Sequence, residues 1–384
     1  MSRLPIFIVL TVFLLSSCQP SQTHKEMVDA DSVVSVNDNS INKDSLSIVN
    51  QTARLIAGMT VDSSMPFYRH TLHPEWKAYS ERAERVWKQF DSISQKYISF
   101  AKREFYPVAD TFRTVFYPFS GPDFLFVNFF YPKADKIYMF GLEEPGSLPS
   151  LEKVPTDSIA PLLNIYKTAI EDVINISFFR TVDMKVELSN AHVDGTAPIL
   201  MLFLVRSGKE VIAVNPVTLD QQGRFIPRNI KDKVENKAIE ITYRNPGESK
   251  TRYIYYLSTN IADPSLKKNI PFYNFLKNLE PNIGGYIKSA TYLMHKSYFS
   301  IVRNTVLNKT NVFLQDDSGI GFKYIKPEKW NTILYGSYSK PIPLFEEHFE
   351  QDLLDAFKTG NPKPLGFRIG YHPKSNLLLA IRKK

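Results

Sequence analysis

Cysteine is almost absent from this chain, because Cys18 is the only one among 384 residues. No disulfide can therefore form within one chain, and no Cys-x-x-Cys motif is present. The sequence also lacks Gly-x-Ser-x-Gly and His-Glu-x-x-His, and Gly284-Gly285 lacks the spacing of a P-loop or dinucleotide motif. These absences weigh against classical serine hydrolases, zinc proteases and thiol redox proteins.

Long apolar runs and basic arms are missing as well. After residue 18 no segment reaches the ~18 uninterrupted apolar residues of a membrane-spanning helix. The 47 Lys and Arg outnumber the 39 Asp and Glu, giving a formal net charge of +8, but they are dispersed along the chain. The longest basic run is residues 382–384. We interpret the charge as a solvated surface and predict no nucleic-acid partner.

The first residues have the pattern of an export signal. Arg3 is followed by an almost unbroken apolar run over residues 4–15, which is shorter than the ~20 residues that span a bilayer. Residues 15–18, with sequence LSSC, resemble the bacterial lipobox. The resemblance implies a signal peptide over residues 1–17 and a lipid on Cys18, the mature N-terminus. Gln19 rather than Asp follows, which favours the outer membrane of the cell envelope.

The organisation after Cys18 follows from composition. Residues 19–50 are rich in Ser, Asn, Asp, Gln and Thr and contain no aromatic residue. Such a segment cannot bury enough apolar area to offset its ordering entropy, so residues 18–50 are predicted to be a lipidated, disordered tether. Residues 51–384 are expected to form a single large globular body. Two abutting lobes, about 51–210 and 211–384, are the alternative.

The body mixes helical and strand patterns. The i, i+3, i+4 spacing predicts helices over residues 158–177, 297–308 and 344–358. Strands are predicted over residues 111–116, 136–141, 211–217, 239–244, 252–258, 311–315, 320–325 and 377–382. The mixture predicts an α+β fold, or mixed α/β with antiparallel additions, in which helices flank a mixed sheet.

The first polar motif is residues 116–123, with sequence FYPFSGPD, before the apolar run FLFV. A strand there gives way to a helix, whose first N–H groups can hold an anion or oxyanion, with Ser120 or Asp123 at the mouth. The alternative is structural: Ser120 caps the helix, and Asp123 favours the positive end of its dipole.

The second polar motif is residues 313–320, with sequence FLQDDSGI. Adjacent carboxylates repel unless a cation, a shared proton or hydrogen bonds compensate, so Asp316 and Asp317 are candidates for general acid–base chemistry. A divalent cation at this pair is a further possibility, and no other cofactor is predicted. The alternative is a solvent-screened β-turn that includes Ser318. His295 could titrate near neutral pH, although a lone histidine is more often packed or on the surface.

Four segments together resemble a family of uncharacterised secreted bacterial proteins. They are residues 117–123 (YPFSGPD), 139–143 (MFGLE), 289–296 (SATYLMHK) and 314–320 (LQDDSGI). The resemblance covers about residues 90–384 and implies no activity. The sequence departs from the family pattern at Gly321, where Pro is expected.

Two functions remain open, and whether the protein is an enzyme is left undecided. The first is a lipid-anchored protein of the cell envelope that binds an envelope ligand or protein partner. The second is a hydrolase or transferase acting on an envelope polymer. Its candidate catalytic residues are Ser120, Asp123, His295, Asp316 and Asp317, with the loops at residues 120–123 and 316–318 forming one polar site.

Overall fold

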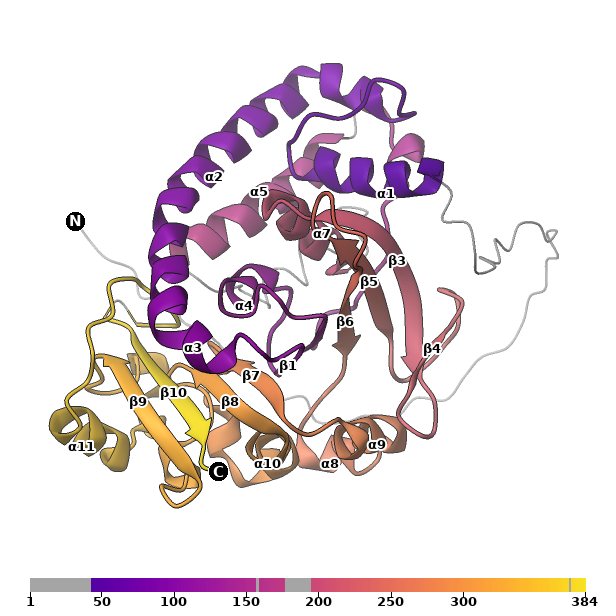
Figure 1. Ribbon diagram of the computed structural model, residues 1–384. Helices are drawn as coiled ribbons and strands as arrows, with labels where there is room; N and C mark the ends of the chain where they lie inside the picture. The colour runs from indigo at the N-terminus through magenta and orange to yellow at the C-terminus, as the bar shows by residue number, and fades with distance from the viewer. Residues whose placement is uncertain (1–42, 157–158, 177–194, 373) are drawn as a thin grey trace, which may run out of the picture. The chain divides into compact units, whose positions relative to one another are not determined.

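A computed structural model describes residues 43–156, 159–176, 195–372 and 374–384. Its centre is a ten-stranded sheet with the strand order β4-β3-β5-β6-β2-β1-β7-β8-β10-β9 (Figure 1). The strands are β1 (Thr114–Tyr117), β2 (Lys136–Gly141), β3 (Glu210–Leu219), β4 (Phe225–Pro227), β5 (Ala238–Arg244), β6 (Arg252–Ser258), β7 (Ile283–Ile287), β8 (Thr310–Gln315), β9 (Trp330–Gly336) and β10 (Asn376–Arg382).

The middle of the sheet is parallel and its two sides are antiparallel. Strands β6, β2, β1, β7 and β8 run in one direction. Strands β4, β3 and β5 extend one side, and β10 and β9 extend the other, through antiparallel pairs. The predicted fold class, mixed α/β with antiparallel additions and flanking helices, is therefore confirmed.

Helices cover both faces of this sheet (Figure 1). They are α1 (Lys43–Ile56), α2 (Pro74–Phe100), α3 (Tyr106–Ala109), α4 (Phe124–Phe130), α5 (Ile159–Ile176), α7 (Ala197–Arg206), α8 (Asp263–Leu266), α9 (Ile270–Asn278), α10 (Ser300–Lys309) and α11 (Gln351–Thr359). The shorter helical turns are η1 (Tyr68–Leu72), η2 (Ala101–Phe105), η3 (Leu151–Lys153), η5 (Leu293–His295), η6 (Ser297–Phe299), η7 (Phe322–Tyr324) and η8 (Pro343–His348).

Two apolar cores result, one on each face. Side chains of α1, α2, α4, α5 and α7 share the first core with Val115 and Tyr117 of β1. Side chains of α8, α9, α10 and α11 share the second core with Phe116 of the same strand. Successive side chains of β1 thus point alternately into the two cores, as expected for a strand buried on both sides. In the described part of the chain, no helix combines the length and apolarity needed to cross a membrane.

The position of β1 creates a crevice in the parallel part. The connection β1–α4–β2 leads to one side of β1, whereas β7–α10–β8 leads away on the other. In open sheets, loops at such a switch point diverge and leave space outside the carboxyl ends of the strands. Both polar motifs follow strands at this edge.

Several expectations need correction. Residues 320–325 do not form a strand, since η7 occupies their middle. The helix predicted over 344–358 is divided into η8 and α11, because Phe349 and Glu350 have extended backbone. Helix α1 begins at Lys43, inside the predicted tether, and Ala53 and Ile56 on it are buried in the first core. The sheet also joins strands from before and after residue 210, so it does not divide there. The predicted signal peptide and Cys18 lie outside the described residues.

Candidate functional site

A cavity of about 180 Å³ lies at the carboxyl ends of β1, β2 and β7. We call it the switch-point pocket. Its lining residues come from the last residues of β1 and β2, from the segments that follow these strands and β7, and from the C-terminal part of the chain: Tyr117, Phe119, Ser120, Gly121, Asp123, Gly141, Leu142, Glu143, Lys288, Ser289, Thr291, Leu293 and Tyr371. The pocket is thus formed where the fold leaves a crevice.

A buried ion pair lies in this pocket. The ammonium of Lys288 is 2.7 Å from Oδ2 of Asp123, and both side chains are almost fully buried. The ammonium also lies over the ring of Phe126, 3.6 Å from its centroid, which is a cation–π contact. Burial lowers the pKa of Lys288, whereas the carboxylates of Asp123 and Asp316 act in the opposite direction. Such a perturbed, paired group in a cleft marks a candidate functional site.

Asp123 has two further partners. The hydroxyl of Tyr117 donates to Oδ2 at 2.8 Å, and the backbone N–H of Phe126 donates to Oδ1 at 3.2 Å. Asp123 is therefore the N-cap of α4. The carboxylate of Asp123 thus caps α4 and also orients the side chains of Tyr117 and Lys288.

Ser120 does not cap the helix, contrary to the structural alternative. Its Oγ accepts from the backbone N–H of Phe140 at 3.0 Å and donates to the carbonyl of Phe140 at 3.2 Å. The backbone N–H of Ser120 also donates to this carbonyl, at 2.9 Å. Ser120 thus ties the loop after β1 to β2, and its hydroxyl already has protein partners on one side of the pocket.

Asp316 holds the loop that follows β7 through hydrogen bonds. Its Oδ2 accepts from the N–H of Ser289 at 2.9 Å, and its Oδ1 accepts from the N–H and hydroxyl of Ser318. The hydroxyl of Ser318 in turn accepts from the N–H of Ala290 at 2.7 Å. Burial raises the pKa of Asp316, and the charge of Asp317 raises it further. The solvent-screened turn is therefore the wrong alternative, because both carboxylates are buried.

Asp317 points to a different set of partners. It accepts from the hydroxyl of Tyr292, from Nε2 of His372 at 3.2 Å and from Nδ2 of Asn376 at 3.0 Å. Every oxygen of both carboxylates thus meets a protein donor. Within the described ranges, no group of three or more His, Cys, Asp or Glu side chains is arranged to hold a metal ion. This arrangement gives no support to the divalent cation considered possible at this pair.

His295 lies close to these carboxylates but does not line the pocket. Its ring packs edge-on against Tyr292, with centroids 5.2 Å apart, and Nδ1 is 3.9 Å from Oε2 of Glu350. Burial, together with nearby His348, lowers the pKa of His295 to about 4. The imidazole is therefore neutral near pH 7, and a proton shuttle into the pocket has no support in this position.

The loops around the pocket have unusual backbone conformations. Phe119, Ser289, Thr291 and Tyr292 all have φ between 50° and 58°, in the left-handed region. Such residues cost free energy and persist where the surroundings enforce them, often at functional sites. Among the described residues, the Oγ of Ser289 is buried without a hydrogen-bond partner. A bound ligand could supply that partner.

The predicted residues are thus only partly brought together. Ser120 and Asp123 line the pocket, whereas Asp316, Asp317 and His295 do not, although Asp316 is hydrogen-bonded to its lining residue Ser289. Sequence reasoning missed Lys288, Ser289, Glu143 and Tyr371. A signal existed for Lys288 and Ser289, since a charged and a polar residue directly follow the apolar run of β7. No local signal marks Tyr371, whose hydroxyl donates to the carbonyl of Ser289 at 2.7 Å.

Comparisons with protein-family models, with curated proteins and with solved structures find no match to this chain.

Proposed function

We propose that this protein is a lipid-anchored protein of the cell envelope that binds a small uncharged or cationic ligand in the switch-point pocket. The proposal rests on one observation: residues of the first motif line this pocket together with Lys288 and Ser289. Asp316 of the second motif is hydrogen-bonded to the backbone of Ser289 and so fixes the loop after β7. Polar groups from separate parts of the chain converge on one small cavity, which is the general form of a ligand site.

The charge of the pocket limits the ligand. Two lining carboxylates, Asp123 and Glu143, face one lining ammonium, Lys288. Since Asp123 is already paired with Lys288, the remaining charge is negative, and an anionic ligand would be repelled. Hydroxyl or amine groups can donate to Glu143 and to Oγ of Ser289. The carboxylate of Glu143 is held by the hydroxyl of Tyr256 at 3.0 Å, so it is already oriented.

The size of the pocket limits the ligand further. Its volume of about 180 Å³ is below the ~300–1,000 Å³ of sites for drug-sized molecules. A single sugar or amine group fits this volume better than a long polymer segment. Leu142 at the rim is 70% exposed, so part of the wall is open to solvent. One end group of a larger envelope molecule could enter there.

Calorimetric titration of the purified protein tests the proposal. N-acetylglucosamine and ethanolamine serve as uncharged and cationic probes, and inorganic phosphate serves as the anionic one. We expect Leu142→Trp to weaken binding because the new ring narrows the mouth. The matched control is Leu72→Trp, at an exposed leucine outside the pocket. Preferential binding of phosphate, or equal effects of the two variants, would contradict the proposal.

The membrane attachment is a separate part of the proposal and has its own test. Its support is the lipobox-like sequence at residues 15–18. Metabolic labelling with a palmitate analogue should mark the wild-type protein and leave a Cys18→Ser variant unlabelled. Fractionation of the labelled cells would then distinguish the proposed outer membrane from the inner one.

A hydrolase or transferase acting on an envelope polymer is the second candidate. One observation favours it: Ser289 combines a strained backbone with an unpartnered, buried hydroxyl beside Lys288. Release of soluble sugars from isolated envelope polymers would reveal such an activity. A Ser289→Ala variant should abolish that release while retaining the fold. If the wild-type protein binds a ligand but releases nothing, the binding function stands alone.

A further inference from the structure

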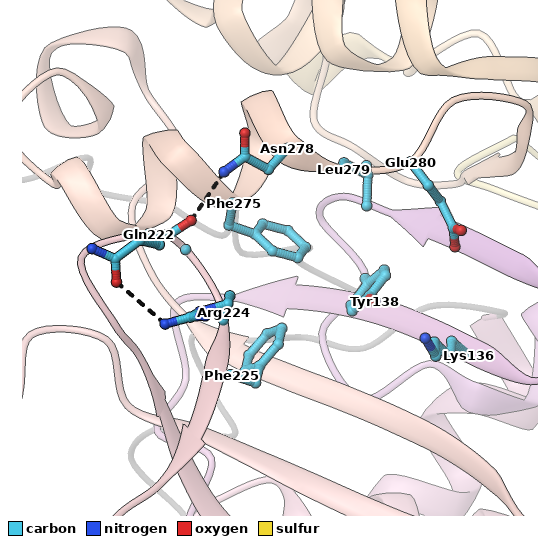
Figure 2. A pocket seen from close by; sticks show the side chains of 10 residues that line it. Lys136, Tyr138, Gln222, Arg224, Phe225, Phe275, Asn278, Leu279 and Glu280 are labelled. Atoms are coloured by element: carbon cyan, nitrogen blue, oxygen red, sulfur yellow. Dashed lines mark hydrogen bonds between the residues drawn. The ribbon is translucent and has the colours of Figure 1, made fainter.

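A second cavity, of about 460 Å³, lies at the opposite edge of the sheet. Lys136, the first residue of β2, and Glu280, shortly before β7, line one end of it (Figure 2). This is the amino-terminal edge of the parallel strands, whereas the switch-point pocket lies at their carboxyl ends. The second cavity is therefore a separate site, and it does not depend on the function proposed above.

Aromatic rings form the walls of this cavity, which we call the aromatic groove. Tyr138 and Phe225 lie nearly parallel, with centroids 6.0 Å apart and an angle of 9° between their planes. Phe275 stands edge-on to both, at 5.1 Å from Tyr138 and 5.5 Å from Phe225. Figure 2 shows these three rings around the space between the strands and α9. Flat, electron-rich ring faces are surfaces on which C–H groups pack well.

Planar polar groups surround the rings at both ends. Gln222, Arg224 and Asn278 lie at the end away from Lys136 and Glu280 (Figure 2). An amide, a guanidinium and a carboxylate can each make paired hydrogen bonds to vicinal hydroxyls. Apolar faces between polar ends match a ligand that has C–H surfaces and hydroxyl edges together.

The charges of the groove nearly cancel. Arg224 is paired with Asp220, with its Nη2 2.8 Å from Oδ2. Lys136 and Glu280 then contribute one charge of each sign. Burial, with the charge of Glu280, raises the pKa of Tyr138 to about 12, so its phenol is neutral near pH 7. A groove without net charge favours an uncharged ligand over a fatty acid or an anionic polymer.

The groove is also fixed in place before any ligand binds. The loop between β3 and β4 is held to α9, because Nδ2 of Asn278 donates to the carbonyl of Gln222 at 3.0 Å and Nδ2 of Asn274 donates to that of Gln221 at 2.8 Å. Gly223, with φ of +79°, lets this loop approach, since a Cβ there would lie 2.2 Å from the backbone N of Phe275. A rigid wall reduces the entropic cost of binding.

We propose that the aromatic groove binds a segment of an uncharged glycan, whose sugar rings pack on Tyr138, Phe225 and Phe275 while their hydroxyls bind the polar ends. At about 460 Å³ the site lies within the range of ordinary ligand pockets and exceeds the switch-point pocket. A protein with this groove would hold a glycan by recognition of its sugars.

Calorimetry on the purified full chain tests this assignment. The probes are neutral tetrasaccharides of N-acetylglucosamine, glucose and mannose, with decanoate as the apolar comparison. At least one tetrasaccharide should bind, with an affinity that hardly changes between roughly 50 and 500 mM salt because the ligand is uncharged. Phe225→Leu should weaken that binding about tenfold through loss of a ring face. The matched control Phe349→Leu, at an exposed phenylalanine outside the groove, should leave it unchanged.

A second variant covers the case in which Phe225→Leu disturbs the hairpin. Glu280 is exposed, and a glutamine there can still accept from the hydroxyl of Thr114. Glu280→Gln should weaken sugar binding about threefold to tenfold by removing a charged acceptor. The Leu142→Trp variant of the switch-point pocket should leave it unaffected, so the two sites can fail separately. The proposal is overturned if no tetrasaccharide binds, if both groove variants bind the sugar as tightly as the wild-type protein, or if only decanoate binds.

Discussion

The buried pair of Asp123 and Lys288 should behave as one energetic unit, and a double-mutant cycle can measure it. Asp123→Asn keeps an acceptor for the N–H of Phe126 but removes the counter-charge of a buried ammonium. Removing one partner of a buried pair costs about 3–5 kcal/mol. Because the charge of Asp316 still acts on Lys288, we expect the lower end, about 3 kcal/mol.

The reverse single variant should cost less. Lys288→Met leaves Asp123 ionised, but Tyr117 and the N–H of Phe126 still donate to it, so we expect about 2 kcal/mol. The double variant has no unpaired charge, and methionine fills much of the lysine volume. It should cost about 2 kcal/mol in total, which gives a coupling energy of about 3 kcal/mol between the two positions.

Urea unfolding at pH 7.5, followed by tryptophan fluorescence, measures these free energies. The exposed pair of Lys340 and Glu346, 3.1 Å apart with side chains 62% and 63% exposed, provides the matched control. The cycle of Lys340→Met and Glu346→Gln should show a coupling below about 1 kcal/mol. If the effects of Asp123→Asn and Lys288→Met simply add, the pair is not an energetic unit and the reasoning is refuted.

Three further predictions concern the surroundings of the pocket. The pKa of His295, about 4, lies below that of an unfolded histidine, so its contribution to stability is present above about pH 6.5 and is lost as the pH falls toward 4, by up to about 3 kcal/mol. In urea unfolding at a series of pH values, His295→Gln should therefore reduce the dependence of the free energy of unfolding on pH in this window. An unchanged pH dependence in the variant would contradict this. Thr291→Gly should raise the free energy of unfolding by about 1 kcal/mol, because it removes the strain of a β-branched residue at φ of +50°. A lower stability of the variant in urea unfolding would show that this conformation is not strained. Gly370→Ala should lower the melting temperature and reduce the free energy of unfolding by about 3 kcal/mol, since the new Cβ would lie 2.2 Å from Oδ2 of Asp316 at φ of +70°. An unchanged melting temperature would mean that this loop shifts freely.

The sequence allowed much of the sheet to be predicted. Strands β2 and β6 have the predicted bounds, and helix α5 agrees within a residue at each end. These elements have strong periodic patterns. Strand β7 was missed because all five residues are buried and two are glycines, so no alternation is visible. Helix α2 was missed although Trp76, Tyr79, Ala83 and Trp87 form a readable stripe along it.

The candidate site was less predictable, because its partners are remote in sequence. The segment at Asp316 and Asp317 is a turn, as local composition indicates. Its burial depends on His372 and Asn376, which approach from the C-terminal part of the chain. Asp123 was correctly placed at a helix start, but nothing near it indicates that Lys288 is its partner. Turn chemistry is local, whereas burial is decided by tertiary contacts.

The residues around the two cavities differ in their effect on the stability of the fold, and this difference bears on function. Around the switch-point pocket, several residues have left-handed backbone, and an ion pair with two further carboxylates is buried nearby. Apolar residues of similar volume often give equal or greater stability than a buried pair. Among the residues that line the aromatic groove, only Gly223 has a positive φ, and the rings of Tyr138 and Phe225 pack against each other. Local rules are broken mainly where a site requires it. We therefore expect the switch-point pocket to tolerate few substitutions without loss of its ligand, and the groove to lose affinity gradually as rings are removed.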